Sequence, residues 1–139
     1  MFPLMSLICN MVYHVRFTTY INNNYTRAFR VLILFVYNDD LLNIISKMNI
    51  NNSDEFRNNL EILKSQNIGK LSVVEKEVIS GKVYPMEKII LNNDNSVSSV
   101  IIFLDQEDNG NKYMQKMVIS PGSREILNIK IDNNGIFLS

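Results

Sequence analysis

The chain has 139 residues and a mass of 16.1 kDa, which is the size of one domain or of one domain with an appendage. Hydrophobic residues make up 46%, enough to bury a core, and Lys plus Arg equals Asp plus Glu at 14 each. This balance disfavours a nucleic-acid binder, which normally carries a basic excess to neutralise phosphates. The single cysteine, Cys9, excludes an intrachain disulfide framework.

Neither apolar segment of the N-terminal third predicts a membrane helix. The start, MFPLMSLIC, is apolar but lacks the basic region and the small-residue cleavage site of a signal peptide. It therefore gives only weak support for a signal peptide. The apolar run 31–37 has seven residues, whereas a membrane-spanning helix needs about 20. We therefore expect a soluble protein with no membrane partner, in the cytoplasm rather than secreted.

Two strands are expected first in chain order. Residues 11–21 and 27–37 are rich in β-branched and aromatic side chains, and the segment NNNYT lies between them. This composition predicts two strands joined by a turn, because such side chains suit a pleated surface and Asn suits turns. The two strands are expected to form an N-terminal strand pair.

Two short helices should follow the strand pair. Asp39 and Asp40 supply capping oxygens and negative charge for the first helix start, and Ser53 opens the second. Gly69 lies just past the expected end of the second helix. Apolar residues recur at helical spacing in both segments, so we expect each helix to pack one side on the core. These residues are Leu41, Ile45 and Met48 in the first helix and Phe56, Leu60 and Leu63 in the second.

From residue 70 onward the apolar period changes to two, which predicts strands. The expected strands cover 71–79, 83–91, 97–104, 112–119, 125–132 and 136–139. Polar and apolar residues alternate most clearly in 125–132, which predicts one buried and one wet face. Residues 100–105 are apolar on both faces and should therefore occupy a central position in a sheet.

These patterns predict an α+β, mainly β fold in two parts. Residues 1–69 would hold the strand pair and the two helices, and residues 70–139 would form an antiparallel β domain. That domain is expected to be a β-sandwich, with a small five-stranded barrel as the alternative. The Ser-Pro-Gly-Ser step at 120–123 would then connect two strands.

Residues 83–132 also show a recognisable order of features. An isoleucine-rich strand enters an Asn-rich turn (KIILNNDNS), and the next strand ends in an acidic loop (VSSVIIFLDQEDNGNKY). A further strand reaches a Pro-Gly-Ser turn before the next begins (MQKMVISPGSREILNIKID). This order resembles the small β-sandwich accessory domains of tailed-phage virion structural proteins. The resemblance implies a non-catalytic packing or assembly role, with a virion as an alternative location to the cytoplasm, and it transfers no active-site residue.

The acidic loop DQEDNGN at 105–111 is the best candidate for a metal site. Asp105, Glu107, Asn109 and Gly110 approximate the start of a calcium loop. The twelfth position, where a bidentate Glu should close the site, is Lys116. We therefore expect a hairpin with Asn109 and Gly110 at its turn and no bound metal, while cation binding by this loop stays an open alternative.

No catalytic or cofactor motif is evident. His14 is the only histidine, and Cys9 five residues earlier lies in the same apolar stretch with nothing to orient the imidazole. Zinc-ligand spacings and phosphate-binding glycine loops are absent from the sequence. The adjacent carboxylates are expected at helix starts or in a loop, where they cap or solvate the chain. They are Asp39/Asp40, Asp54/Glu55 and Glu107/Asp108. We therefore expect no enzyme and no cofactor.

Aromatic and basic residues mix in the N-terminal third. The aromatic residues are Tyr13, Phe17, Tyr20, Tyr25, Phe29, Phe35 and Tyr37, with Arg16, Arg27 and Arg30 among them. Such a mixture would suit either an ordinary strand core or a base-stacking surface, and the balanced charge favours the core. We expect a structural or interaction module with a protein partner or self-association. The alternative is a small barrel that binds single-stranded nucleic acid.

Overall fold

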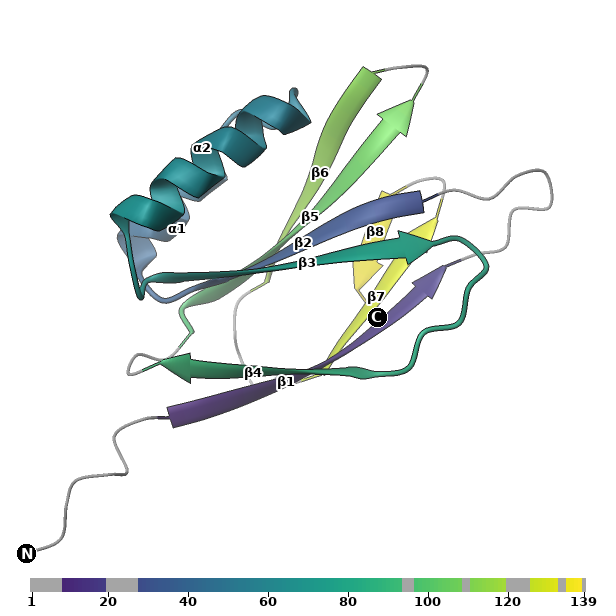
Figure 1. Cartoon of the computed structure of the whole chain (residues 1–139), viewed down its shortest axis with the longest axis horizontal. Coiled ribbons are helices and arrows are strands. Elements are labelled where there is room, and N and C mark those ends of the chain that lie inside the picture. The colour runs from purple at the N-terminus through teal and green to yellow at the C-terminus, as the bar shows by residue number, and fades with distance from the viewer. Residues whose placement is uncertain are drawn as a thin grey trace, which may run out of the picture.

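The structure is a computed structural model, and it describes residues 9–19, 28–93, 97–108, 111–119, 126–132 and 135–138. The described residues form three layers: two helices, a first sheet beneath them, and a second sheet against the far face of the first (Figure 1). The elements in chain order are β1 (Cys9–Thr19), β2 (Ala28–Val36), α1 (Asp39–Ser46), α2 (Ser53–Gln66), β3 (Leu71–Ile79), β4 (Glu87–Asn93), β5 (Ser99–Asp108), β6 (Asn111–Ile119), β7 (Ile126–Asp132) and β8 (Gly135–Leu138).

Both sheets have four strands, in the orders β3-β2-β5-β6 and β4-β1-β7-β8. The pairings within them are antiparallel except that of β1 with β7, which is parallel. The expected α+β, mainly β fold is therefore confirmed. The barrel alternative is wrong, because the described strands make two open sheets that face each other.

The two N-terminal strands form as expected but do not pair with each other. β1 lies between β4 and β7, whereas β2 lies between β3 and β5 in the other sheet. The physical reason is burial: β2 is apolar on both faces and needs cover on both, while β1 alternates and needs cover on one. The parts of the chain before and after the boundary expected at residue 69 each supply strands to both sheets. The two parts therefore do not have separate hydrophobic cores.

The helix starts differ in one detail from expectation. The capping oxygens come from asparagines: Asn38 accepts from the backbone N–H of Asp40 at 2.8 Å, and Asn52 accepts from that of Glu55 at 3.0 Å. Asp39 and Asp40 instead lie in the first turn of α1, where negative charge interacts favourably with the helix dipole. Both caps have extended backbone, the conformation in which a side-chain oxygen reaches the first free amides.

Two hydrophobic clusters hold the layers together. The larger lies between the sheets and includes the ring pair Tyr13 and Phe35, with centroids 4.9 Å apart. The smaller lies between the helices and the first sheet, where the rings of Phe56 from α2 and Phe103 from β5 are 4.6 Å apart. Every residue of β5 from Val100 to Leu104 is buried, so its side chains alternate between the two clusters. The central position expected for residues 100–105 is confirmed.

The strand expected over 83–91 begins only at Glu87. Pro85 has no N–H to donate to a ladder, and the hydroxyl of Tyr84 accepts the N–H of Ile79 on β3 at 2.8 Å, which holds this segment toward the other sheet. The turns expected at 109–110 and 120–123 lie outside the described residues. β5 and β6 pair up to Asp108 and Asn111, and β6 and β7 belong to different sheets.

Replacement of Phe56 by Ala should lower the free energy of unfolding by about 3–5 kcal/mol, because it empties a fully buried ring position against Phe103. Urea denaturation followed by circular dichroism measures this. The matched control is Ile62→Ala on the same helix, whose side chain is 55% exposed and whose loss should cost less than about 0.5 kcal/mol. Equal effects for the two variants would contradict the packing of α2 described above.

Candidate interaction surface

The sheet β4-β1-β7-β8 has one face in the core and one face that no described element covers (Figure 1). Residues alternate between the two faces along each strand, as the pleat requires. We name the uncovered side the open face. Its described side chains are Val12, His14, Arg16, Thr18, Lys88, Ile90, Ile126, Asn128, Lys130 and Phe137.

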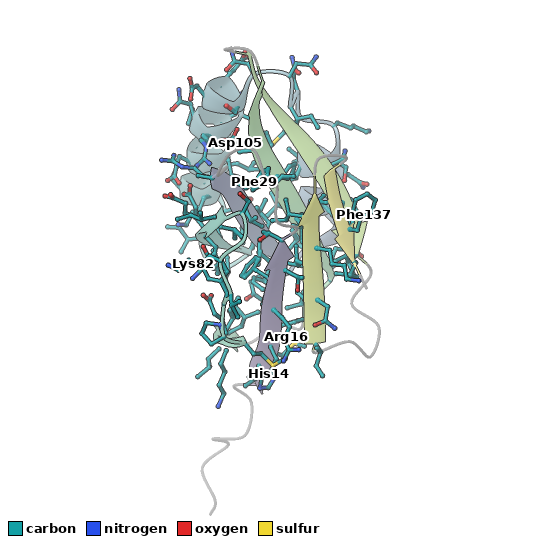
Figure 2. All side chains as sticks on the ribbon, turned by 90° about the vertical axis from the view of Figure 1, so that its right-hand side faces the viewer. His14, Arg16, Phe29, Lys82, Asp105 and Phe137 are labelled. Carbon is teal, nitrogen blue, oxygen red and sulfur yellow. The ribbon has the colours of Figure 1, made fainter. Side chains whose placement is uncertain are left out.

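Strand register places the side chains of the open face in rows. One row consists of Lys88, His14 and Ile126, and another of Thr18, Lys130 and Phe137. Val12 lies beside Ile90 in a third row. Figure 2 shows His14 and Arg16 low on β1 and Phe137 on the edge strand β8. Apolar, polar and basic side chains are therefore mixed on the open face, with exposed apolar residues on β4, β7 and β8.

Large apolar side chains are exposed on the open face. Ile90 is 56% exposed, Ile126 53% and Phe137 45%, each on a different strand. Single exposed apolar residues are common on proteins, but three on one sheet face mark a surface suited to contact with another molecule. The corresponding face of the other sheet carries apolar residues too, and there α1 and α2 cover most of them, while Val118 of β6 is 47% exposed.

The charge of the open face has one sign among its described side chains. Arg16, Lys88 and Lys130 are basic, and none of the described outward side chains is a carboxylate; the side chain of Asp132, which continues the outward series on β7, lies outside those described. None of the three forms an ion pair with another described side chain. The balanced net charge of the chain thus conceals a local basic surface, which attracts acidic groups.

A cavity of about 420 Å³ opens beside the last residues of β1. It lies between residues 16–19 and the segment 81–86, which links β3 to β4. The lining contains Arg16 and Lys82 but no carboxylate. The cavity exists because β4 pairs with β1 only as far as Glu87 and Val15, so the end of β1 has no described strand on this side.

The candidate catalytic residues His14 and Cys9 both lie on β1. His14 is partly buried on the open face between Lys88 and Ile126, and its described row contains no serine, threonine or cysteine. Cys9 is the first residue of β1, and its side chain lies outside those described. Within the described part of the chain no three His, Cys, Asp or Glu residues are grouped so that they could hold a metal ion.

Asp105, the first residue of the acidic loop considered for calcium, is engaged in an ion pair. Its carboxylate accepts from Arg57 of α2 at 3.3 Å (Nε) and 3.1 Å (Nη2), and Arg57 also donates to Glu75 of β3 at 2.9 Å. Figure 2 shows Asp105 on the helical side of the molecule. This bond ties α2 to β5. Asn109 and Gly110 lie outside the described residues, as do the side chains of Glu107 and Asp108.

The other carboxylate pairs and the aromatic residues have structural positions. Asp39/Asp40 and Asp54/Glu55 lie in the first turns of α1 and α2, as expected, and are exposed. The described aromatic residues of the N-terminal third are buried, which confirms the expected strand core; they are Tyr13, Phe17, Phe29, Phe35 and Tyr37. Arg16 and Arg30 are exposed on strands, whereas Tyr20, Tyr25 and Arg27 lie outside the described residues.

Neither the open face nor the cavity was anticipated from the sequence. The alternation in β7 correctly indicated one wet face, but the rows depend on the parallel pairing of β1 with β7, which brings together residues more than 100 positions apart. The only sequence signal for the cavity is Pro85, which interrupts an otherwise strand-like segment.

No protein-family model and no curated protein matches the chain. A solved structure does: the Lip protein of Serratia marcescens, described as a membrane-bound component of the type VI secretion system. The two share a TM-score of 0.60 over 94% of this chain and 97% of the Serratia chain, with 9% sequence identity. This similarity shows that the two chains share a fold. Neither of the described helices is long and apolar enough to span a membrane.

Replacement of Asp105 by Asn should lower the free energy of unfolding by about 1–3 kcal/mol, because it removes the less exposed of the two charged acceptors of the partly buried Arg57. Chemical denaturation at neutral pH measures the loss. Glu75→Gln removes the other partner of the same guanidinium, but that side chain is 45% exposed and its loss should cost less than about 1 kcal/mol. A larger loss for Glu75→Gln than for Asp105→Asn would contradict this assignment.

Proposed function

We propose that this protein is a non-catalytic interaction module that binds a protein partner through the open face. The observation that carries the proposal is the asymmetry of the sandwich. Helices cover most of the outer face of one sheet, while the outer face of the other exposes Ile90, Ile126 and Phe137 among basic residues that form no ion pair with another described side chain. Burial of these apolar side chains would supply binding energy, and the charges would select the partner.

The charge of the open face argues for a different, acidic protein rather than a second copy. A symmetric dimer through this face would bring Arg16, Lys88 and Lys130 of one copy against the same residues of the other. Like charges across an interface cost free energy, whereas an acidic patch on a partner would pair with them. The partner surface we expect therefore combines carboxylates with apolar side chains.

The fold similarity is consistent with this proposal. The Serratia marcescens Lip protein, a component of a secretion system by its description, shows that a chain of this fold can serve within a larger assembly. A virion-associated role, implied by the resemblance of residues 83–132 to phage accessory domains, stays a prediction. Binding of single-stranded nucleic acid through the aromatic residues of the N-terminal third is disfavoured, because those that the structure describes are in the core and cannot stack on bases.

The proposal is tested by photocrosslinking in cells that naturally make the protein. A benzophenone amino acid replaces Ile90, Ile126 or Phe137 in turn, and adducts are identified by mass spectrometry. We expect one discrete protein adduct, with its crosslinked segment rich in Asp and Glu. Charge reversal of Lys88 and Lys130 together to Glu should reduce its yield by about tenfold, because the partner's carboxylates then meet like charges.

The helical layer provides matched controls. Ile44 on α1 is 52% exposed and Ile62 on α2 is 55% exposed, close to the values on the open face, so the crosslinker is equally accessible at all these positions. These two positions should not give the adduct. The proposal fails if they give it as strongly, if the open-face positions crosslink only to nucleic acid, lipid or a second copy of the chain, or if they give no adduct.

A further inference from the structure

The end of β1 has a free side within the described part of the chain. Residues 16–19 pair with residues 128–131 of β7 on one side, and on the other side they border the cavity described above. In a strand, every second residue directs its N–H and C=O toward a given side. The cavity is therefore lined by backbone donors and acceptors that a further strand would satisfy.

The opposite wall of the cavity is fixed in place. The N–H of Gly81 donates to Oγ1 of Thr19 at 2.9 Å, and that of Ile79 donates to the Tyr84 hydroxyl at 2.8 Å. Gly81 has φ of 78°, a conformation that favours glycine, in the turn that follows β3. Pro85 cannot donate to β1. The segment 81–86 therefore borders the place of a strand without filling it.

The side chains around the cavity are apolar and basic. Phe17 forms part of the inner wall, while Val83 and Met86 are 91% and 40% exposed at the rim. Arg16 and Lys82 are exposed (both labelled in Figure 2), and Nζ of Lys82 lies 5.4 Å from the ring centre of Tyr84. Lys76, whose Nζ lies 5.1 Å from the same ring centre, forms an ion pair with Glu87.

We propose that this cavity is a slot for an extended acidic peptide of a protein partner, which adds a short strand to β1 at residues 16–19. The peptide's backbone would bond to the free side of β1, as in other cases of strand addition. Its alternate side chains would face inward toward Phe17, where apolar residues fit, and outward beside Arg16, where carboxylates fit. The recognised sequence thus alternates apolar and acidic residues.

The slot goes beyond the proposed function, because it binds in a different way, although Arg16 belongs to both the slot and the open face. The open face offers side chains of four strands, whereas the slot offers the backbone of one strand end. Lys82 lines only the slot, and Lys88 lies only on the open face. Variants of these two lysines therefore separate the two proposals.

The test selects peptides from a phage-displayed library of random ten-residue sequences on the purified full-length protein. We expect enriched sequences in which acidic and apolar residues alternate. A synthetic peptide of the most enriched sequence should bind Lys82→Glu about tenfold more weakly than wild type, because its carboxylates then face a like charge. Fluorescence anisotropy measures this, and Lys88→Glu, the same change at another exposed lysine, should stay within about twofold of wild type.

A second measurement locates the peptide. Hydrogen exchange of those backbone amides in residues 16–19 that face the slot should slow when the peptide is bound, because its carbonyls accept from them, whereas the amides that face β7 should not change. The slot proposal is overturned if no sequence is enriched, if the enriched peptides are basic or neutral, if Lys82→Glu leaves affinity unchanged, or if protection appears at another strand edge. Crosslinks from Ile90, Ile126 and Phe137 do not depend on the slot, so the open-face proposal would survive each of these outcomes.

Discussion

The architecture depends on two strands that are apolar on both faces. In β2 and β5, successive side chains alternate between two hydrophobic clusters, so neither face can meet water. Such strands are stable only as the middle layer of three. The helices cover one side, and the second sheet covers the other (Figure 1). The sheet β3-β2-β5-β6 is therefore the centre on which the other layers assemble.

The outer sheet has a different requirement. Its strands need only one apolar face to complete the core, so the opposite side is free of the demands of folding. That side could consist of polar residues alone, as on many solvated sheets, yet it carries exposed isoleucine and phenylalanine with basic neighbours. Residues that do not stabilise the fold and are costly to expose are the ones that a binding surface would use.

The link between the two sheets creates the second candidate site. The segment after β3 must cross from the middle layer to the outer one, and Gly81, Tyr84 and Pro85 determine its path. Because that path reaches β1 only at Val15, residues 16–19 of β1 pair with no described strand on this side. The path of this segment thus leaves backbone N–H and C=O groups of residues 16–19 without a described strand partner, at a kind of sheet edge that proteins usually cover.

The sequence by itself determined the elements and their faces. Period-two alternation predicted β7 with Leu127, Ile129 and Ile131 buried, and the apolar run 100–105 predicted a central strand, because burial preferences act on each segment locally. Strand partners were not predictable in this way. β1 and β2 are both apolar enough to pair, and only the need to cover β2 on two faces placed them in different sheets. The tertiary structure alone decided the rows of the open face and the slot beside β1, because both arise from strands that are distant in sequence and meet through long-range packing.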